Sequence, residues 1–102
     1  MADFIKIAAQ SDLPGTNEAK EFRGGSKEIC VANIEGEYSA MENSCVHRGG
    51  PLGQGMVERG KVVCPWHGWA WDPKTGQAVQ DSRAKIAVYA MKIENGDVKV
   101  EI

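Results

Sequence analysis

The stretch IAVYAMKIENGDVKVEI, residues 86–102, gives the clearest indication of the fold. Its two halves, 86–94 and 97–102, are rich in valine and isoleucine, and Asn95-Gly96 separates them. An Asn-Gly pair tolerates the positive φ angles of a type I′ turn, which joins two antiparallel strands directly. The stretch therefore predicts a β-hairpin.

Short β-type runs followed by turn residues also fill the chain upstream. Residues 29–34 form a nearly continuous apolar run, as expected for a strand buried on both faces. Turn signals at Glu35-Gly36, Arg59-Gly60 and residues 73–76 separate further runs at 37–41, 61–63 and 69–71. No segment shows a helical periodicity over three turns, and within 11–22 only residues 18–22 fit either a helical turn or a strand. We therefore expect an all-β fold, an antiparallel β-sandwich or small barrel.

The composition sets limits on domain number and partners. The chain has 102 residues, of which 42% are hydrophobic, so we expect a single domain, residues 1–102, with one modest core. A net charge of −2 provides no basic surface for nucleic acid or anionic lipid. The longest apolar run, residues 86–91, is too short to span a membrane, and MADFIKIAAQ at the start does not resemble a secretory signal. We expect a cytoplasmic protein, in which clustered cysteines more often bind metal than form disulfides.

Two short glycine-containing stretches, CVHRGG (45–50) and CPWHGW (64–69), hold both histidines and two of the three cysteines. Thiolates and imidazoles are good ligands for a thiophilic metal centre, which makes Cys45, His47, Cys64 and His67 the candidate ligands. Each pair lies beside a predicted strand, so two loops can meet at one end of the sandwich. The neighbouring glycines let the backbone approach a bulky inorganic group and leave amide N–H groups for its sulfur atoms.

A structural zinc ion in a Cys₂His₂ site is one alternative for these four residues. Zinc fingers usually pair like ligands in sequence, two cysteines and then two histidines. This chain pairs one cysteine with one histidine in each stretch, which suits a centre with two metal ions better. The zinc-binding module stays as a minor alternative.

The pattern C-x-H, sixteen residues and C-x-x-H resembles the ligand pattern of the Rieske iron–sulfur family. The extended stretches CVHRGGPL (45–52) and CPWHGW (64–69) carry the resemblance, which covers residues 27–102. It implies one 2Fe–2S cluster per chain, held by two cluster-binding loops at one end of a Rieske-like β-sandwich. By this resemblance Cys45 and Cys64 bind one iron, and His47 and His67 bind the other.

The resemblance also implies a low-potential centre. Two neutral imidazoles in place of two thiolates raise the midpoint potential above the roughly −400 mV of four-cysteine ferredoxins. High-potential relatives carry a disulfide at the positions of Gly50 and Trp66, and hydroxyl donors at those of Trp69 and Trp71. Tryptophan has only an indole N–H to donate. We therefore expect a midpoint potential nearer to about −150 mV than to zero.

The chain lacks the residues that catalysis by a Rieske protein needs. Rieske oxygenases use a second iron site with two histidines and a carboxylate, whereas both histidines here are already assigned. No dinucleotide-binding fingerprint is present either. The resemblance therefore implies a Rieske-type ferredoxin, a one-electron carrier between a flavin-dependent reductase and a terminal, ring-hydroxylating oxygenase. The alternative is a small subunit of a larger oxidoreductase such as assimilatory nitrite reductase.

Some other residues have structural interpretations. Trp69 and Trp71 alternate along one strand and should share a face, where core packing is the expected role. Cys30 lies in the apolar run 29–34 and should be a buried free thiol. The six glutamates of residues 18–42 are interpreted as a solvated face rather than a docking site. Arg48 is expected to pair with an acid such as Asp72.

Overall fold

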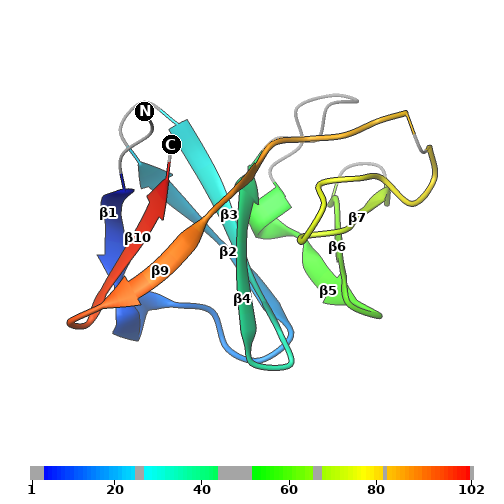
Figure 1. Ribbon diagram of the computed structural model, residues 1–102. Coiled ribbons are helices and arrows are strands. Elements are labelled where there is room, and N and C mark those ends of the chain that lie inside the picture. The colour runs from blue at the N-terminus through cyan, green and yellow to red at the C-terminus, as the bar shows by residue number, and fades with distance from the viewer. Residues whose placement is uncertain (1–3, 25–26, 44–51, 66–67, 82, 102) are drawn as a thin grey trace.

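The computed structural model describes residues 4–24, 27–43, 52–65, 68–81 and 83–101. In this part of the chain the fold is all-β, as predicted, with two short 3₁₀ helices and no α-helix (Figure 1). None of its helices is long and apolar enough to cross a membrane. The elements in chain order are β1 (Phe4–Ala9), η1 (Gln10–Asp12), β2 (Glu18–Gly24), β3 (Lys27–Ile34), β4 (Glu37–Glu42), η2 (Leu52–Gln54), β5 (Met56–Glu58), β6 (Lys61–Val63), β7 (Ala70–Trp71), β8 (Val88–Tyr89), β9 (Met91–Glu94) and β10 (Asp97–Glu101).

The strands form three antiparallel sheets with the orders β1-β10-β9, β2-β3-β4-β8 and β5-β6-β7. Figure 1 shows β2, β3 and β4 between the other two sheets. Strand β3 is central to this arrangement because its alternate side chains enter two different cores. Cys30 and Ala32 pack with residues of β6 and β7, whereas Ile29 and Val31 pack with Val100 of β10. The prediction of a strand buried on both faces is confirmed.

The hairpin turns follow one backbone pattern. Glu35, Arg59 and Asn95 each have a φ of 52°, and each is followed by a glycine with a positive φ. Two successive positive φ angles are the signature of the type I′ turn, whose twist matches that of the flanking strands. The predicted C-terminal hairpin is therefore present, with β9 paired to β10.

The structure corrects the prediction for one segment and decides between two alternatives for another. Residues 86–94 do not form one strand, because Val88–Tyr89 pairs with β4 and Met91–Glu94 pairs with β10. The chain passes from one sheet to another at Ala90, and apolar patterning does not specify which neighbour a strand will choose. Residues 18–22, ambiguous between helix and strand, belong to β2, which pairs along its length with β3.

Candidate metal centre

Of the four candidate ligands, Cys64 lies in the described part of the chain, and Cys45, His47 and His67 lie outside it. Cys64 directly follows β6, in a turn closed by two backbone hydrogen bonds. Its N–H donates to the carbonyl of Trp69 at 2.8 Å, and the Gly68 N–H donates to the Cys64 carbonyl at 3.0 Å. Gly68 has a φ of 71°, a left-handed conformation that suits glycine. The base of the second predicted ligand loop is thus well defined.

The strand register directs Cys64 toward the core. Val62 pairs with Trp71 across β6 and β7, and the side chain of Cys64, two residues further on, emerges from the same face of the sheet as that of Val62. All three residues belong to the core between this sheet and β3, and Cys64 is only 1% exposed. Its thiol is free in the structure.

The first predicted ligand loop is held at its base by Asn43, directly after β4. The Leu52 N–H donates to the Asn43 carbonyl at 3.1 Å, which joins the residues flanking 44–51. The Asn43 side chain is 1% exposed and makes two further hydrogen bonds. Its Oδ1 accepts from the Gly53 N–H, and its Nδ2 donates to Glu21 Oε2, both at 2.6 Å.

Glu21 completes this network from β2. Its second carboxylate oxygen accepts a hydrogen bond from Gln54 Nε2 at 2.9 Å. One carboxylate therefore holds residues on both sides of the first predicted loop, Asn43 before it and Gln54 after it. Sequence reasoning missed all three residues, although an asparagine just before the ligand motif was the available signal, since buried polar side chains are nearly always hydrogen-bonded.

The bases of the two predicted loops lie next to each other. A largely apolar hollow of about 420 Å³ is lined on one side by Gln54, Gly55 and Met56, and on the other by residues 63–65 and Gly68. Gly53 and Gly55 lie where other segments of the chain come very close. A Cβ on Gly53 would collide with Glu21, and one on Gly55 with the Val63 carbonyl. These glycines let protein segments pack closely against one another.

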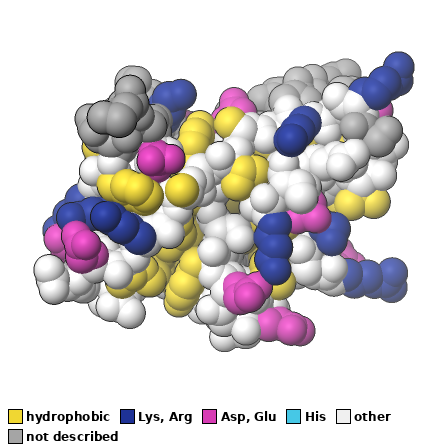
Figure 2. All heavy atoms as spheres, viewed as in Figure 1, with side chains coloured by type: hydrophobic (Ala, Val, Ile, Leu, Met, Phe, Trp, Pro, Cys, Tyr) yellow, Lys and Arg dark blue, Asp and Glu magenta, His cyan; other side chains and the backbone are white. Residues whose placement is uncertain are grey.

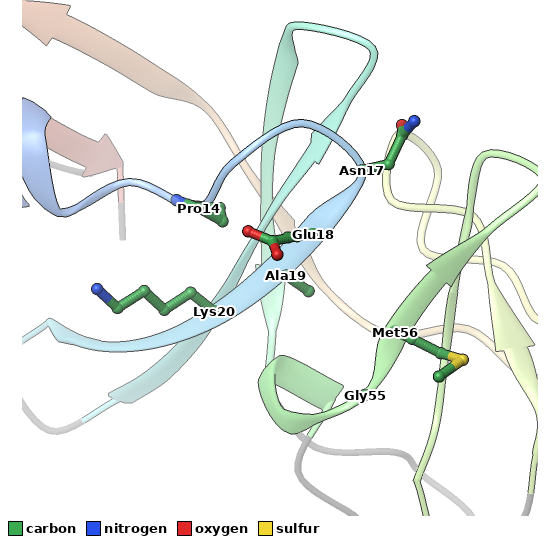
Figure 3. A pocket seen from close by; sticks show the side chains of 7 residues that line it. All are labelled: Pro14, Asn17, Glu18, Ala19, Lys20, Gly55 and Met56. Atoms are coloured by element: carbon green, nitrogen blue, oxygen red, sulfur yellow. The ribbon is translucent and has the colours of Figure 1, made fainter.

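A second hollow, of about 340 Å³, lies on the other side of Gly55 and Met56, against the start of β2 (Figure 3). None of the described residues that line it is a cysteine or histidine, and its described charged lining residues are Glu18 and Lys20. The described lining of this hollow therefore offers no ligand of the kind that a thiophilic metal prefers. Across the whole described part, no three His, Cys, Asp or Glu side chains come together as a metal site. The candidate centre rests on Cys64 and on the sequence motif.

The surroundings of Cys64 fit a sulfur-containing inorganic group. Among the described residues, the indole Nε1 of Trp71 has no hydrogen-bond partner, and the residue is 0% exposed. A buried N–H group lacking an acceptor is costly, so a group that brings acceptors into this region suits the site. The thiol of Cys64 and the indole N–H of Trp71 thus lie on the same face of the β6–β7 strand pair.

The other residues singled out from the sequence have structural roles. The rings of Trp69 and Trp71 have centroids 6.1 Å apart and pack against the same core, as predicted. Cys30 is a buried free thiol, and burial, with a smaller contribution from Glu21, raises its pKa to about 12. The Oδ2 of Asp72 lies 4.0 Å from the Nζ of Lys61. Arg48, the predicted partner of Asp72, lies outside the described residues.

Most of the glutamates of residues 18–42 form hydrogen bonds or ion pairs with other residues of the chain. Besides Glu21, three of the six side chains bind neighbours: Glu18 accepts from the Gly15 N–H, Glu42 accepts from the Ala87 N–H, and Glu37 pairs with Lys74 at 2.8 Å. On the face shown in Figure 2, acidic and basic side chains are interspersed. These contacts agree with the interpretation of a solvated face.

Comparisons with known proteins agree with the motif. The Rieske [2Fe-2S] domain family matches residues 3–90. The ferredoxin component of the naphthalene 1,2-dioxygenase/salicylate 5-hydroxylase systems of Ralstonia sp. is 31% identical over 101 residues, which cover 98% of this chain and 96% of that protein.

Solved structures share the fold. One comes from the complex of reduced oxygenase and oxidized ferredoxin in carbazole 1,9a-dioxygenase, with a TM-score of 0.79 and 25% identity over 94% of this chain and 99% of that one. Another is the putative NADH-dependent nitrite reductase small subunit of Mycobacterium tuberculosis, with a TM-score of 0.86 over 100% of this chain and 96% of that one. At 17% identity, this second likeness shows the fold alone.

Proposed function

The chain belongs to the Rieske [2Fe-2S] domain family, and we propose that it carries electrons from a flavin-dependent reductase to a terminal ring-hydroxylating oxygenase. The observation that carries this proposal is the nearly full-length match to a ferredoxin component of a dioxygenase system. The chain is accordingly an electron-transfer component and not itself a catalyst. By contrast, its match to an oxygenase component, that of 3-ketosteroid-9-alpha-monooxygenase, covers only 16% of that protein.

The chain holds one 2Fe–2S cluster, and we propose Cys45, His47, Cys64 and His67 as its ligands. Cys45 and Cys64 would bind one iron, and His47 and His67 the other. When bound, the cluster takes up and gives back one electron at a time. Described residues support the bases of the two predicted loops: Asn43 and Glu21 hold the first, and the backbone hydrogen bonds between Cys64, Gly68 and Trp69 hold the second. Rigid loop bases limit rearrangement between redox states.

We also propose that residues 1–102 work as a single domain in the cytoplasm. The single domain is supported by β3, whose side chains take part in both cores. The cytoplasmic location rests on the sequence argument that cysteines paired with histidines indicate metal binding in a reducing compartment.

Analysis of anaerobically purified protein tests the proposed centre. We expect about two iron and two acid-labile sulfide atoms per chain, and an EPR spectrum of the reduced protein with a lower average g-value than four-cysteine clusters give. Alanine substitution of Cys45, His47, Cys64 or His67 should each abolish this signal. Cys30→Ala is the matched control, because it removes the third cysteine and should leave the signal intact. A colourless protein with one zinc ion per chain would instead establish the zinc module.

The partners need a separate experiment. In stopped-flow mixing, a flavin-dependent reductase with NADH should reduce the protein, and a ring-hydroxylating oxygenase should then reoxidise it. The second candidate function is that of a small subunit of a larger oxidoreductase such as assimilatory nitrite reductase, whose structural likeness to this chain shows the fold alone. Co-purification of the native protein in a stable large complex, with no reoxidation by the oxygenase, would support that alternative.

A further inference from the structure

The indole N–H of Trp71 is an unusual feature of the core. Within the described residues, its Nε1 is the only buried side-chain nitrogen or oxygen atom that has no hydrogen-bond partner. Buried polar groups are nearly always paired, because an unmade hydrogen bond in the interior loses its solvation without compensation. The ring is fully buried, so water at the protein surface does not reach it. This donor therefore needs an acceptor that the described chain does not supply.

The packing around Trp71 shows why the described residues offer the indole no acceptor. Val62 lies directly opposite it on β6, and Ala78 forms an isolated bridge with it on the other side. The other buried members of this core contribute hydrocarbon or sulfur side chains: Cys30, Ala32, Met41, Leu52, Cys64 and Ile86. None of their atoms accepts a hydrogen bond from the indole.

The register places Trp71 close to the proposed ligand Cys64. Since Val62 and Trp71 are direct cross-strand partners, Cys64 is a diagonal neighbour of Trp71 on the same face of the hairpin. Diagonal neighbours lie roughly 7–8 Å apart between Cα atoms, within reach of a large aromatic side chain. An acceptor bound at the Cys64 thiolate would therefore lie within reach of the indole N–H of Trp71.

We propose that Trp71 Nε1–H donates a hydrogen bond to a sulfur atom on the Cys64 side of the 2Fe–2S cluster. This inference rests on the proposed function, since it needs the cluster. Reduction places additional negative charge on the sulfurs, so a donor aimed at them stabilises the reduced form more than the oxidised form. Trp71 therefore raises the midpoint potential and supplies a donor to a centre that lacks hydroxyl groups at positions 69 and 71.

The test compares Trp71→Phe with Val62→Ala. Trp71→Phe removes the donor and loosens the packing, whereas Val62→Ala loosens the same packing from the opposite strand and keeps the donor. For Trp71→Phe we expect the ratio of reduced to oxidised protein at a fixed potential to fall three- to tenfold. A tenfold change corresponds to 59 mV for one electron. Val62→Ala should leave the midpoint potential unchanged. Equal shifts in both variants would show a packing effect and overturn the proposal.

A measurement on the unaltered protein avoids any dependence on how the variants fold. Pulsed EPR of the reduced protein with ¹⁵N-labelled tryptophan should show a ¹⁵N coupling and an exchangeable proton coupling that disappears in D₂O. Both couplings should be absent in Trp71→Phe and retained in Trp69→Phe. An intact Rieske signal with no tryptophan coupling would overturn the role of Trp71 alone. Absence of the Rieske signal itself would overturn the proposed function.

Discussion

Replacing Asn43 by alanine removes the side chain that holds the base of the first predicted ligand loop. Two hydrogen bonds of 2.6 Å are lost, one from the Gly53 N–H and one to Glu21. The buried Gly53 N–H would be left without an acceptor, at a cost of about 1–3 kcal/mol. Glu21 is half-buried and keeps its hydrogen bond from Gln54, so losing the hydrogen bond from Asn43 costs about 1 kcal/mol of stability. Together these losses predict a destabilisation of about 2–4 kcal/mol, a large part of the net stability of a domain of this size.

Guanidinium unfolding of the cluster-containing protein, followed by far-ultraviolet circular dichroism under anaerobic conditions, measures this loss. Gln54→Ala is the first control, because its exposed bond to Glu21 predicts a loss below about 1 kcal/mol. Val100→Ala is the second control, because it opens the other core and costs about 2 kcal/mol without touching the loops.

Release of the cluster, followed by loss of visible absorption, separates the loop from the rest of the fold. At a matched loss of stability, Asn43→Ala should release the cluster faster than Val100→Ala, since Asn43 directly precedes residues 44–51. Equal release rates in the two variants, or a destabilisation by Asn43→Ala below about 1 kcal/mol, would refute the reasoning.

Three further predictions concern other parts of the protein. Burial raises the pKa of Cys30 to about 12, so the folded state keeps a thiol proton that the unfolded chain loses above about pH 9. As the pH rises from 9 to 12, this residue therefore lowers the free energy of unfolding by up to about 1.4 kcal/mol per pH unit. Cys30→Ala should show a shallower decline in thermal unfolding scans across that window, and an equal slope would contradict the assignment. A Cβ at position 55 would meet the Val63 backbone, so Gly55→Ala should lower the free energy of unfolding by more than about 3 kcal/mol. In the control Gly15→Ala, the new Cβ meets only the flexible end of Glu18, so the cost should be less than about 1 kcal/mol. Similar costs for the two variants in denaturant titrations would count against this packing. Redox titration should give a midpoint potential nearer to about −150 mV than to zero, and a value well above about +100 mV would exclude a low-potential centre.

The hairpins and the buried central strand were predictable because their signals are local. Asn95-Gly96 sets its own backbone angles, and the apolar run of β3 reports burial on both faces whatever packs there. The candidate ligands were likewise found from their spacing, since a cysteine and a histidine placed close together in each of two loops are typical of a metal site. Of these ligands, Cys64 lies in the part of the chain that the structure describes.

The sequence by itself determined the all-β class, the turn positions, the family and the four candidate ligands. Only the tertiary structure decided that β8 joins the middle sheet, that Glu21 and Asn43 meet at the base of the first predicted loop, and that the Trp71 indole finds no partner among the described residues. The reason is physical. Turn and ligand chemistry depend on adjacent residues, whereas strand neighbours, polar networks and unmatched donors depend on which distant segments are packed together.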